Sequence, residues 1–153
     1  MRPLLLGFSL ALVACGGGSG GGADADEAVN CAALEADTFV VGFQKTGQDG
    51  VLDFRIMSAT PAPPARNDNA WSVQVNAVAG GAPVENATIK VTPFMPAHGH
   101  GAGKNALVEP GAEPGRYELS PINLWMPGVW ETTVRVTSDA GDDRVVFKFC
   151  IPS

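Results

Sequence analysis

The sequence predicts an all-β domain, namely an immunoglobulin-like antiparallel β-sandwich of about seven strands. Apolar and polar residues alternate with a period of two along most of the chain after residue 30. Twelve prolines and nineteen glycines punctuate the sequence, and beyond the first fifteen residues no segment longer than a turn or two has helical periodicity. Short strands separated by turn signals, within one domain of about 120 residues, are typical of such a sandwich.

The early strands are expected at residues 38–44 (TFVVGFQ) and 51–58 (VLDFRIMS). A clearer strand begins at Trp71, where WSVQVNAVAG places alternate apolar residues on one face. The Gly-Gly pair at 80–81 predicts a turn, and the segment 86–94 (NATIKVTPF) then forms the next strand. The alternation predicts that these strands bury one face and expose the other.

The last two strands are expected to form a terminal hairpin. A short strand at 115–119 (GRYEL) precedes two longer alternating segments, 129–138 (VWETTVRVTS) and 144–151 (RVVFKFCI), which the turn DAGDD joins. Cys150 is expected on the face away from the core, so its bond would lie outside the last strand. The core-facing residues of that strand are Val145, Phe147, Phe149 and Ile151.

The first fifteen residues, MRPLLLGFSLALVAC, have the layout of an export signal, with one positive charge and a short apolar run. Their end, LVAC, resembles the bacterial lipobox, in which the cysteine is acylated and becomes the mature N-terminus. The resemblance implies a signal peptide at 1–14, an acylated Cys15 with a Gly-rich tether at 15–30, and a sandwich domain at 31–153. Gly16 stands where aspartate would indicate the inner membrane, which favours an outer-membrane anchor facing the periplasm. The alternative is an ordinary signal peptide that is cleaved elsewhere.

The cysteine count agrees with an oxidising compartment. Once Cys15 carries lipid, Cys31 and Cys150 remain to form a disulfide that brackets the domain. Two reduced, buried thiols are the alternative. A redox role is not indicated, because no CxxC motif is present.

The charge pattern bears on partners. The chain has ten Lys and Arg residues against sixteen Asp and Glu residues, and no basic cluster. This composition argues against nucleic acid and anionic lipid surfaces as partners, so membrane attachment is expected to come from the lipid.

Catalysis has little support in the sequence, and the protein is expected not to be an enzyme. No GxSxG, HExxH or phosphate-binding glycine motif is present, and both histidines lie in one loop without a serine or cysteine partner. Asp142 and Asp143 lie in a hairpin turn, where turn propensity explains them.

The segment 93–105 (PFMPAHGHGAGKN) contains every histidine of the chain. Cu(I) is soft and prefers thioether and imidazole ligands, so Met95, His98, His100 and Met126 form a chemically suitable set. The neighbouring glycines would let both imidazoles face one point. The alternatives are that the histidines are polar residues of a solvated turn and that Met126 is a packing residue. The tryptophans are expected to pack in the core and at its rim; they are Trp71, Trp125 and Trp130.

Residues 70–150 resemble the YtkA-like domain, which is also related in pattern to FixH-like proteins. The resemblance is carried by WSVQV, then GAPVENATIKVTPFMPAHGHG, then PGRYELSPINLWMPGVWETTVRV. Its most specific part is the pair of Met-Pro elements at Met95 and Met126. It implies a small β-sandwich on the outer side of the cytoplasmic membrane and a role near copper handling and oxidase assembly.

Two functional hypotheses follow. In the first, the protein is a cell-envelope lipoprotein whose sandwich binds copper as Cu(I) through the Met/His loop. In the second, it is a non-catalytic structural or interaction lipoprotein that docks another envelope protein and binds no metal. In both, the partners are the membrane, through the N-terminal lipid, and an envelope protein, with no nucleic acid.

Overall fold

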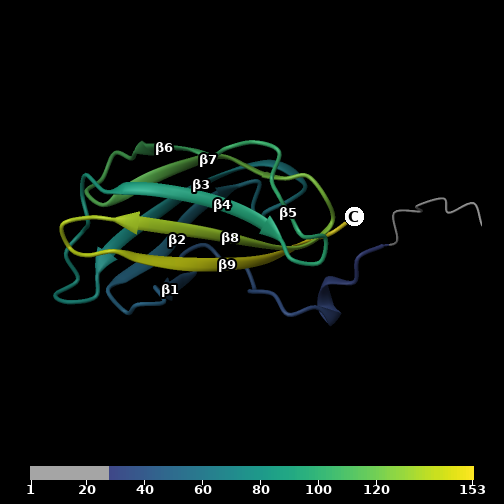
Figure 1. The fold of residues 1–153 in the computed structure, drawn as a ribbon, viewed down its shortest axis with the longest axis horizontal. Helices are drawn as coiled ribbons and strands as arrows, with labels where there is room; N and C mark the ends of the chain where they lie inside the picture. The colour runs from purple at the N-terminus through teal and green to yellow at the C-terminus, as the bar shows by residue number, and fades with distance from the viewer. Residues whose placement is uncertain (1–27) are drawn as a thin grey trace, which may run out of the picture.

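The computed structural model describes residues 28–153, which form two antiparallel β-sheets packed face to face (Figure 1). The first sheet has the strand order β1-β2-β3-β7-β6. The all-β sandwich is therefore confirmed. The strands of the first sheet are β1 (Gln44–Thr46), β2 (Leu52–Thr60), β3 (Asn67–Ala77), β7 (Arg116–Leu124) and β6 (Leu107–Pro110).

The second sheet has the order β5-β4-β8-β9. Its last two strands form the expected terminal hairpin, and its β5 is only a two-residue pairing against the end of β4. A single 3₁₀ turn, η1 (Cys31–Ala33), precedes the first strand. The strands of the second sheet are β5 (His100–Gly101), β4 (Thr88–Met95), β8 (Gly128–Thr137) and β9 (Asp143–Ile151).

The predicted lipidation site and leader, Cys15 and residues 1–14, lie outside the described residues, as does most of the tether. Within residues 28–153, no helix is long and apolar enough to cross a membrane.

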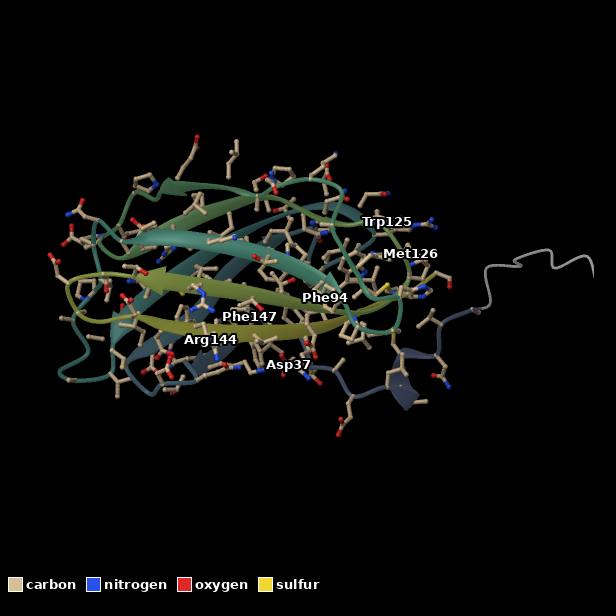
Figure 2. All side chains as sticks on the ribbon, viewed as in Figure 1. Asp37, Phe94, Trp125, Met126, Arg144 and Phe147 are labelled. Carbon is tan, nitrogen blue, oxygen red and sulfur yellow. A yellow bond between two sulfur atoms is a disulfide. The ribbon has the colours of Figure 1, made fainter. Side chains whose placement is uncertain are left out.

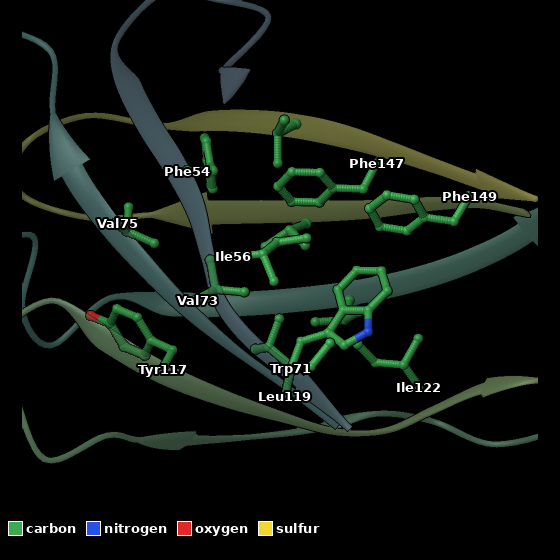
Figure 3. Packing of buried hydrophobic residues seen from close by; sticks show 14 of the residues in the cluster. Phe54, Ile56, Trp71, Val73, Val75, Tyr117, Leu119, Ile122, Phe147 and Phe149 are labelled. Atoms are coloured by element: carbon green, nitrogen blue, oxygen red, sulfur yellow. The ribbon is translucent and has the colours of Figure 1, made fainter. Parts of the chain in front are cut away.

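The core lies between the two sheets and is aromatic at its centre (Figure 3). Trp71 on β3 is fully buried, and its ring meets the edges of Phe147 and Phe149 on β9 at centroid distances of 6.0 and 5.5 Å. Along β9 every second residue is buried, as the alternation predicted. The sequence therefore placed the core-facing side of the last strand correctly.

The segment 38–44 is not the strand that the sequence predicted. Gly42 has φ +86°, a left-handed conformation that turns the chain, and regular pairing begins only at Gln44. The aromatic side chains still point inward: Phe39 meets Phe149 with ring centroids 5.7 Å apart. The apolar residues of this segment therefore cover the core from an irregular chain, which periodicity alone cannot distinguish from a strand.

The outer edge of β9 is covered by the N-terminal segment. Cys31 and Cys150 form a disulfide with a Cα–Cα distance of 5.6 Å, as predicted. Asp37 donates its backbone N–H to the Lys148 carbonyl, and its carboxylate accepts the Lys148 N–H. Lys45 extends its ammonium group to the Val146 carbonyl and to Asp37. These bonds protect an edge that would otherwise be open to pairing with another chain.

Asp143, the first residue of β9, connects the two sheets at the end of the sandwich opposite the C-terminus (Figure 1). It is buried, and its carboxylate accepts backbone N–H bonds of 2.7 to 2.9 Å. Burial raises the pKa of this carboxyl group, but the hydrogen bonds outweigh burial and hold the pKa below its ordinary value. Turn propensity alone, which was the interpretation from sequence, does not describe this role. The donors are Asp49, Val51, Leu52 and Arg144.

Candidate metal centre

The histidine loop is a tight turn between β4 and β5. β4 ends at Met95, and β5 returns so that His100 pairs with Met95. The backbone N–H groups of His98 and Gly99 both donate to the Met95 carbonyl, at 3.2 and 2.9 Å. Gly99 has φ +67°, so a residue with a side chain would be strained there. The turn is thus held by its backbone, which leaves both imidazoles available.

The far side of the loop is fixed by an ion pair. Lys104 extends its ammonium group to Asp68 at the start of β3. Asn123 on β7 donates to the same carboxylate. The hydrogen bonds from Lys104 and Asn123 lower the pKa of Asp68 below its ordinary value. The loop is therefore attached to both sheets.

The two imidazoles lie next to each other at the tip of the loop. Their ring centroids are 5.8 Å apart, and the planes are tilted by 45°. Because an imidazole nitrogen lies about 2 Å from the metal ion that it binds, two rings at this separation can share one ion after small rotations. The arrangement brings the two histidines together, as the sequence predicted.

Each imidazole keeps a nitrogen that can bind a metal. The exposed ring of His98 has no hydrogen-bond partner among residues 28–153. His100 makes one contact, from Nδ1 to the Gly101 carbonyl at 3.1 Å. With the proton on Nδ1, His100 donates to that carbonyl, and Nε2 keeps its lone pair for a ligand.

The two methionines reach the same end of the sandwich but differ in environment. Met95 is only 1% exposed, and its methyl group packs against Gly128, where an added Cβ would lie 2.5 Å from Cε. Met126 is partly buried in the connection between β7 and β8, and its carbonyl accepts a 2.9 Å bond from the Trp130 indole. Figure 2 shows Met126 at the same end of the molecule as the neighbouring Trp125. Met95 is therefore a core residue as well as a candidate ligand.

A depression of about 420 Å³ lies beside His98. Met95 contributes to its lining, so the buried thioether residue borders a space that is open to solvent. The lining comes from three segments that are far apart in sequence: the N-terminal residues Val29, Leu34 and Glu35, the loop residues Met95 to His98, and the β8 residues Pro127, Gly128, Val129 and Glu131.

The donor set suits a soft metal ion. Within the described part of the chain, no three His, Cys, Asp or Glu side chains are grouped so that they could hold a metal. A site at this loop would combine the two imidazoles with one or both thioethers or with a ligand from outside the chain. Imidazole and thioether are the ligands that Cu(I) accepts.

The tryptophans divide into core and rim residues, as expected. Trp71 and Trp130 are fully buried, whereas Trp125 is 40% exposed. Trp125 also has a contact that sequence reasoning missed: its indole stacks on the His100 ring, with centroids 5.0 Å apart and an interplanar angle of 21°. The two residues are 25 positions apart and meet only through the pairing of different strands, so no local pattern indicates the contact.

Comparison with known proteins identifies one family. The family model described as YtkA-like matches residues 47–135, which include β2 to β7, most of β8 and the whole histidine loop. No curated protein matches the sequence at a significant level. Among solved structures, the chain is similar to a copper-bound variant of FetP from uropathogenic Escherichia coli strain F11, with 11% identity and a TM-score of 0.49. The alignment covers 72% of this chain and 95% of that chain, and a likeness at this level carries no functional argument.

Proposed function

The chain belongs to the YtkA-like family, and we propose that its sandwich binds Cu(I) at the end that carries the histidine loop. His98 and His100 supply the imidazole ligands, and Met126 or Met95 supplies thioether sulfur. The protein handles copper in the cell envelope and does not catalyse a reaction. The envelope location rests on the leader and on LVAC in the sequence.

The observation that carries this proposal is the pair of adjacent imidazoles. The rings are 5.8 Å apart, and the turn that bears them is held by backbone bonds to Met95 rather than by the histidine side chains. A solvated turn needs no such pair. The approach of two thioether residues to the same end adds the soft donors that distinguish a Cu(I) site from a zinc site.

A Cu(I) titration of the soluble domain against a competing chelator tests the proposal. We expect stoichiometric competition by the wild-type domain and none by the His98→Ala/His100→Ala double variant. Protons compete with metal for imidazole nitrogen, so the affinity should fall as the pH is lowered. A suitable control is Lys104→Ala, which changes the same loop without removing a metal donor. Competition that survives in the double variant would overturn the proposal.

The thioether ligands are tested by leucine substitution. Met95→Leu and Met126→Leu nearly conserve volume, so each should cost less than about 1.5 kcal/mol of stability. A ligand methionine should show a weaker Cu(I) affinity when replaced, and a packing methionine should not. Met126 is the more accessible of the two and is expected to give the larger loss. Unchanged affinity in both variants would leave a two-histidine site.

The anchor is part of the same proposal. We propose that Cys15 is acylated and that its lipid holds the domain at the membrane, with an outer-membrane location facing the periplasm. Cys15→Ser should block lipid labelling and release an unprocessed or soluble form. Unchanged mass and unchanged membrane fractionation in that variant would contradict the anchor without affecting the copper proposal.

A second candidate function is the docking of another envelope protein without metal. The observation that favours it is the exposure of apolar side chains near the histidine loop: Phe94 and Trp125 are each 40% exposed. The Cu(I) titration separates the two candidates, because a docking domain would not compete with the chelator.

A further inference from the structure

The contact between Trp125 and His100 is more ordered than that of a typical exposed aromatic residue. The indole lies nearly parallel to the imidazole, with centroids 5.0 Å apart. On another side, Trp130 presents its ring to the same imidazole at 5.9 Å and an angle of 63°. His100 therefore lies between an indole that stacks on it and a second, fully buried indole.

The backbone around Trp125 fixes the indole in this position. The Trp125 carbonyl accepts a 2.9 Å hydrogen bond from Nε of Arg66 in the connection between β2 and β3. The carbonyl of the next residue, Met126, accepts a bond of the same length from the Trp130 indole. The two bonds hold the connection between β7 and β8 from both sides, so the stacked ring is attached to both sheets.

We propose that Trp125 is a positioning residue that makes the site selective for Cu(I) over Cu(II), an inference that rests on the proposed function. The indole fixes the orientation of the His100 ring and keeps solvent from one face of it. A metal ion bound to His100 then has fewer positions for water molecules. Trp125 itself supplies no donor atom to the metal.

The difference between the two copper ions gives the selectivity its physical basis. Cu(II) prefers square-planar or tetragonal surroundings with nitrogen and oxygen ligands, whereas Cu(I) is soft and accepts thioether ligands. A site with two imidazoles would need water to complete the surroundings of Cu(II). An apolar ring over His100 removes room for that water and leaves the soft ligands in place.

The stacking can be tested in the metal-free protein. A ring that lies over an indole has its proton resonances shifted upfield, so the imidazole protons of His100 should be upfield of those of His98 in the NMR spectrum. Trp125→Ala should abolish the difference, and Trp125→Phe should keep part of it. Phe94→Ala is the matched control, because Phe94 has the same 40% exposure and should leave the His100 resonances unchanged. Coincident resonances in the wild-type protein would overturn the positioning role.

The selectivity is tested with copper ions alone. In Trp125→Ala, the Cu(I) affinity should fall about tenfold, the lower end of what loss of an orienting contact costs a metal site. The same variant should gain an electron paramagnetic resonance signal from bound Cu(II), which the wild-type and Phe94→Ala proteins should lack. Trp125→Phe should restore most of the Cu(I) preference.

The outcomes separate this inference from the function on which it rests. A wild-type protein that binds no Cu(I) would overturn the proposed function and the selectivity together, whereas the metal-free NMR comparison would still decide the positioning of His100. A wild-type protein that binds Cu(I), together with a Trp125→Ala variant that binds both ions as the wild type does, would overturn the selectivity alone.

Discussion

The two ends of the sandwich treat their polar side chains in opposite ways. At one end, the Asp143 carboxylate is buried and accepts hydrogen bonds from the backbone of two turns. At the other end, the His98 ring is exposed and has no hydrogen-bond partner within residues 28–153, and His100 keeps one nitrogen free of such bonds. Both ends place a strand terminus next to a tight turn, yet only one uses its side chain to hold that turn.

The difference indicates where stability and function lie. A buried carboxylate with several donors cannot be replaced without leaving unpaired N–H groups, so Asp143 is expected to be a structural residue. The histidine turn is held by its own backbone bonds to Met95, so its side chains are available for binding. This comparison leads to four predictions.

The largest effect is expected from the disulfide, which fastens the N-terminal segment to β9 near the histidine end. It joins residues 119 positions apart. Removing a bridge across such a loop should lower the free energy of unfolding by about 4 kcal/mol in the chain-entropy model. Urea denaturation of the Cys31→Ser/Cys150→Ser variant measures the loss. As a control, reductant should destabilise the wild-type domain and leave the variant unchanged; equal stability of the two proteins would contradict the prediction.

The next effect is expected from Asp143→Asn. The new amide group would direct N–H donors at backbone N–H groups that now bond to a carboxylate oxygen, so the free energy of unfolding should fall by about 3 kcal/mol. The neighbouring Asp142→Asn is the matched control, because Asp142 is exposed and should change stability by less than about 0.5 kcal/mol. Similar losses in the two variants would show that the buried carboxylate has no special role.

The pH dependence of stability gives an independent test of Asp143. Its pKa in the folded protein lies below the ordinary value, so its contribution is present above the unfolded pKa of about 3.9 and is lost as the pH falls through the folded pKa. The wild-type protein should therefore lose stability below about pH 4 more steeply than Asp143→Asn does. Parallel acid-unfolding curves for the two proteins would show that other carboxylates dominate.

The sequence was sufficient to predict the sandwich, the terminal hairpin and the disulfide, because each depends on local alternation or on cysteine count. The burial of Phe147 and Phe149, with Cys150 on the opposite face, follows directly from the period of a strand. The irregular segment 38–44 was predicted wrongly, because a run of apolar residues is compatible with both a strand and a chain that only covers the core.

The role of Asp143 and the stacking of Trp125 on His100 could not be predicted. Both depend on which turns and strands become neighbours, and that information is absent from short-range patterns. The meeting of His98 and His100 was predicted because one glycine-containing loop carries both. The four-residue ligand set stays a prediction: its members gather at one end of the sandwich, and Met95 is also buried there.

The smallest effect on stability is expected where the effect on binding should be largest. In His98→Ala/His100→Ala the backbone bonds of the turn remain, and the lost contacts are a side-chain bond to Gly101 and the stacking on Trp125. The free energy of unfolding of the metal-free domain should therefore change by less than about 1 kcal/mol. Thermal and urea denaturation without copper measure this change. A loss as large as that of Asp143→Asn would mean that the histidines hold the turn, and the contrast between the two ends would then fail.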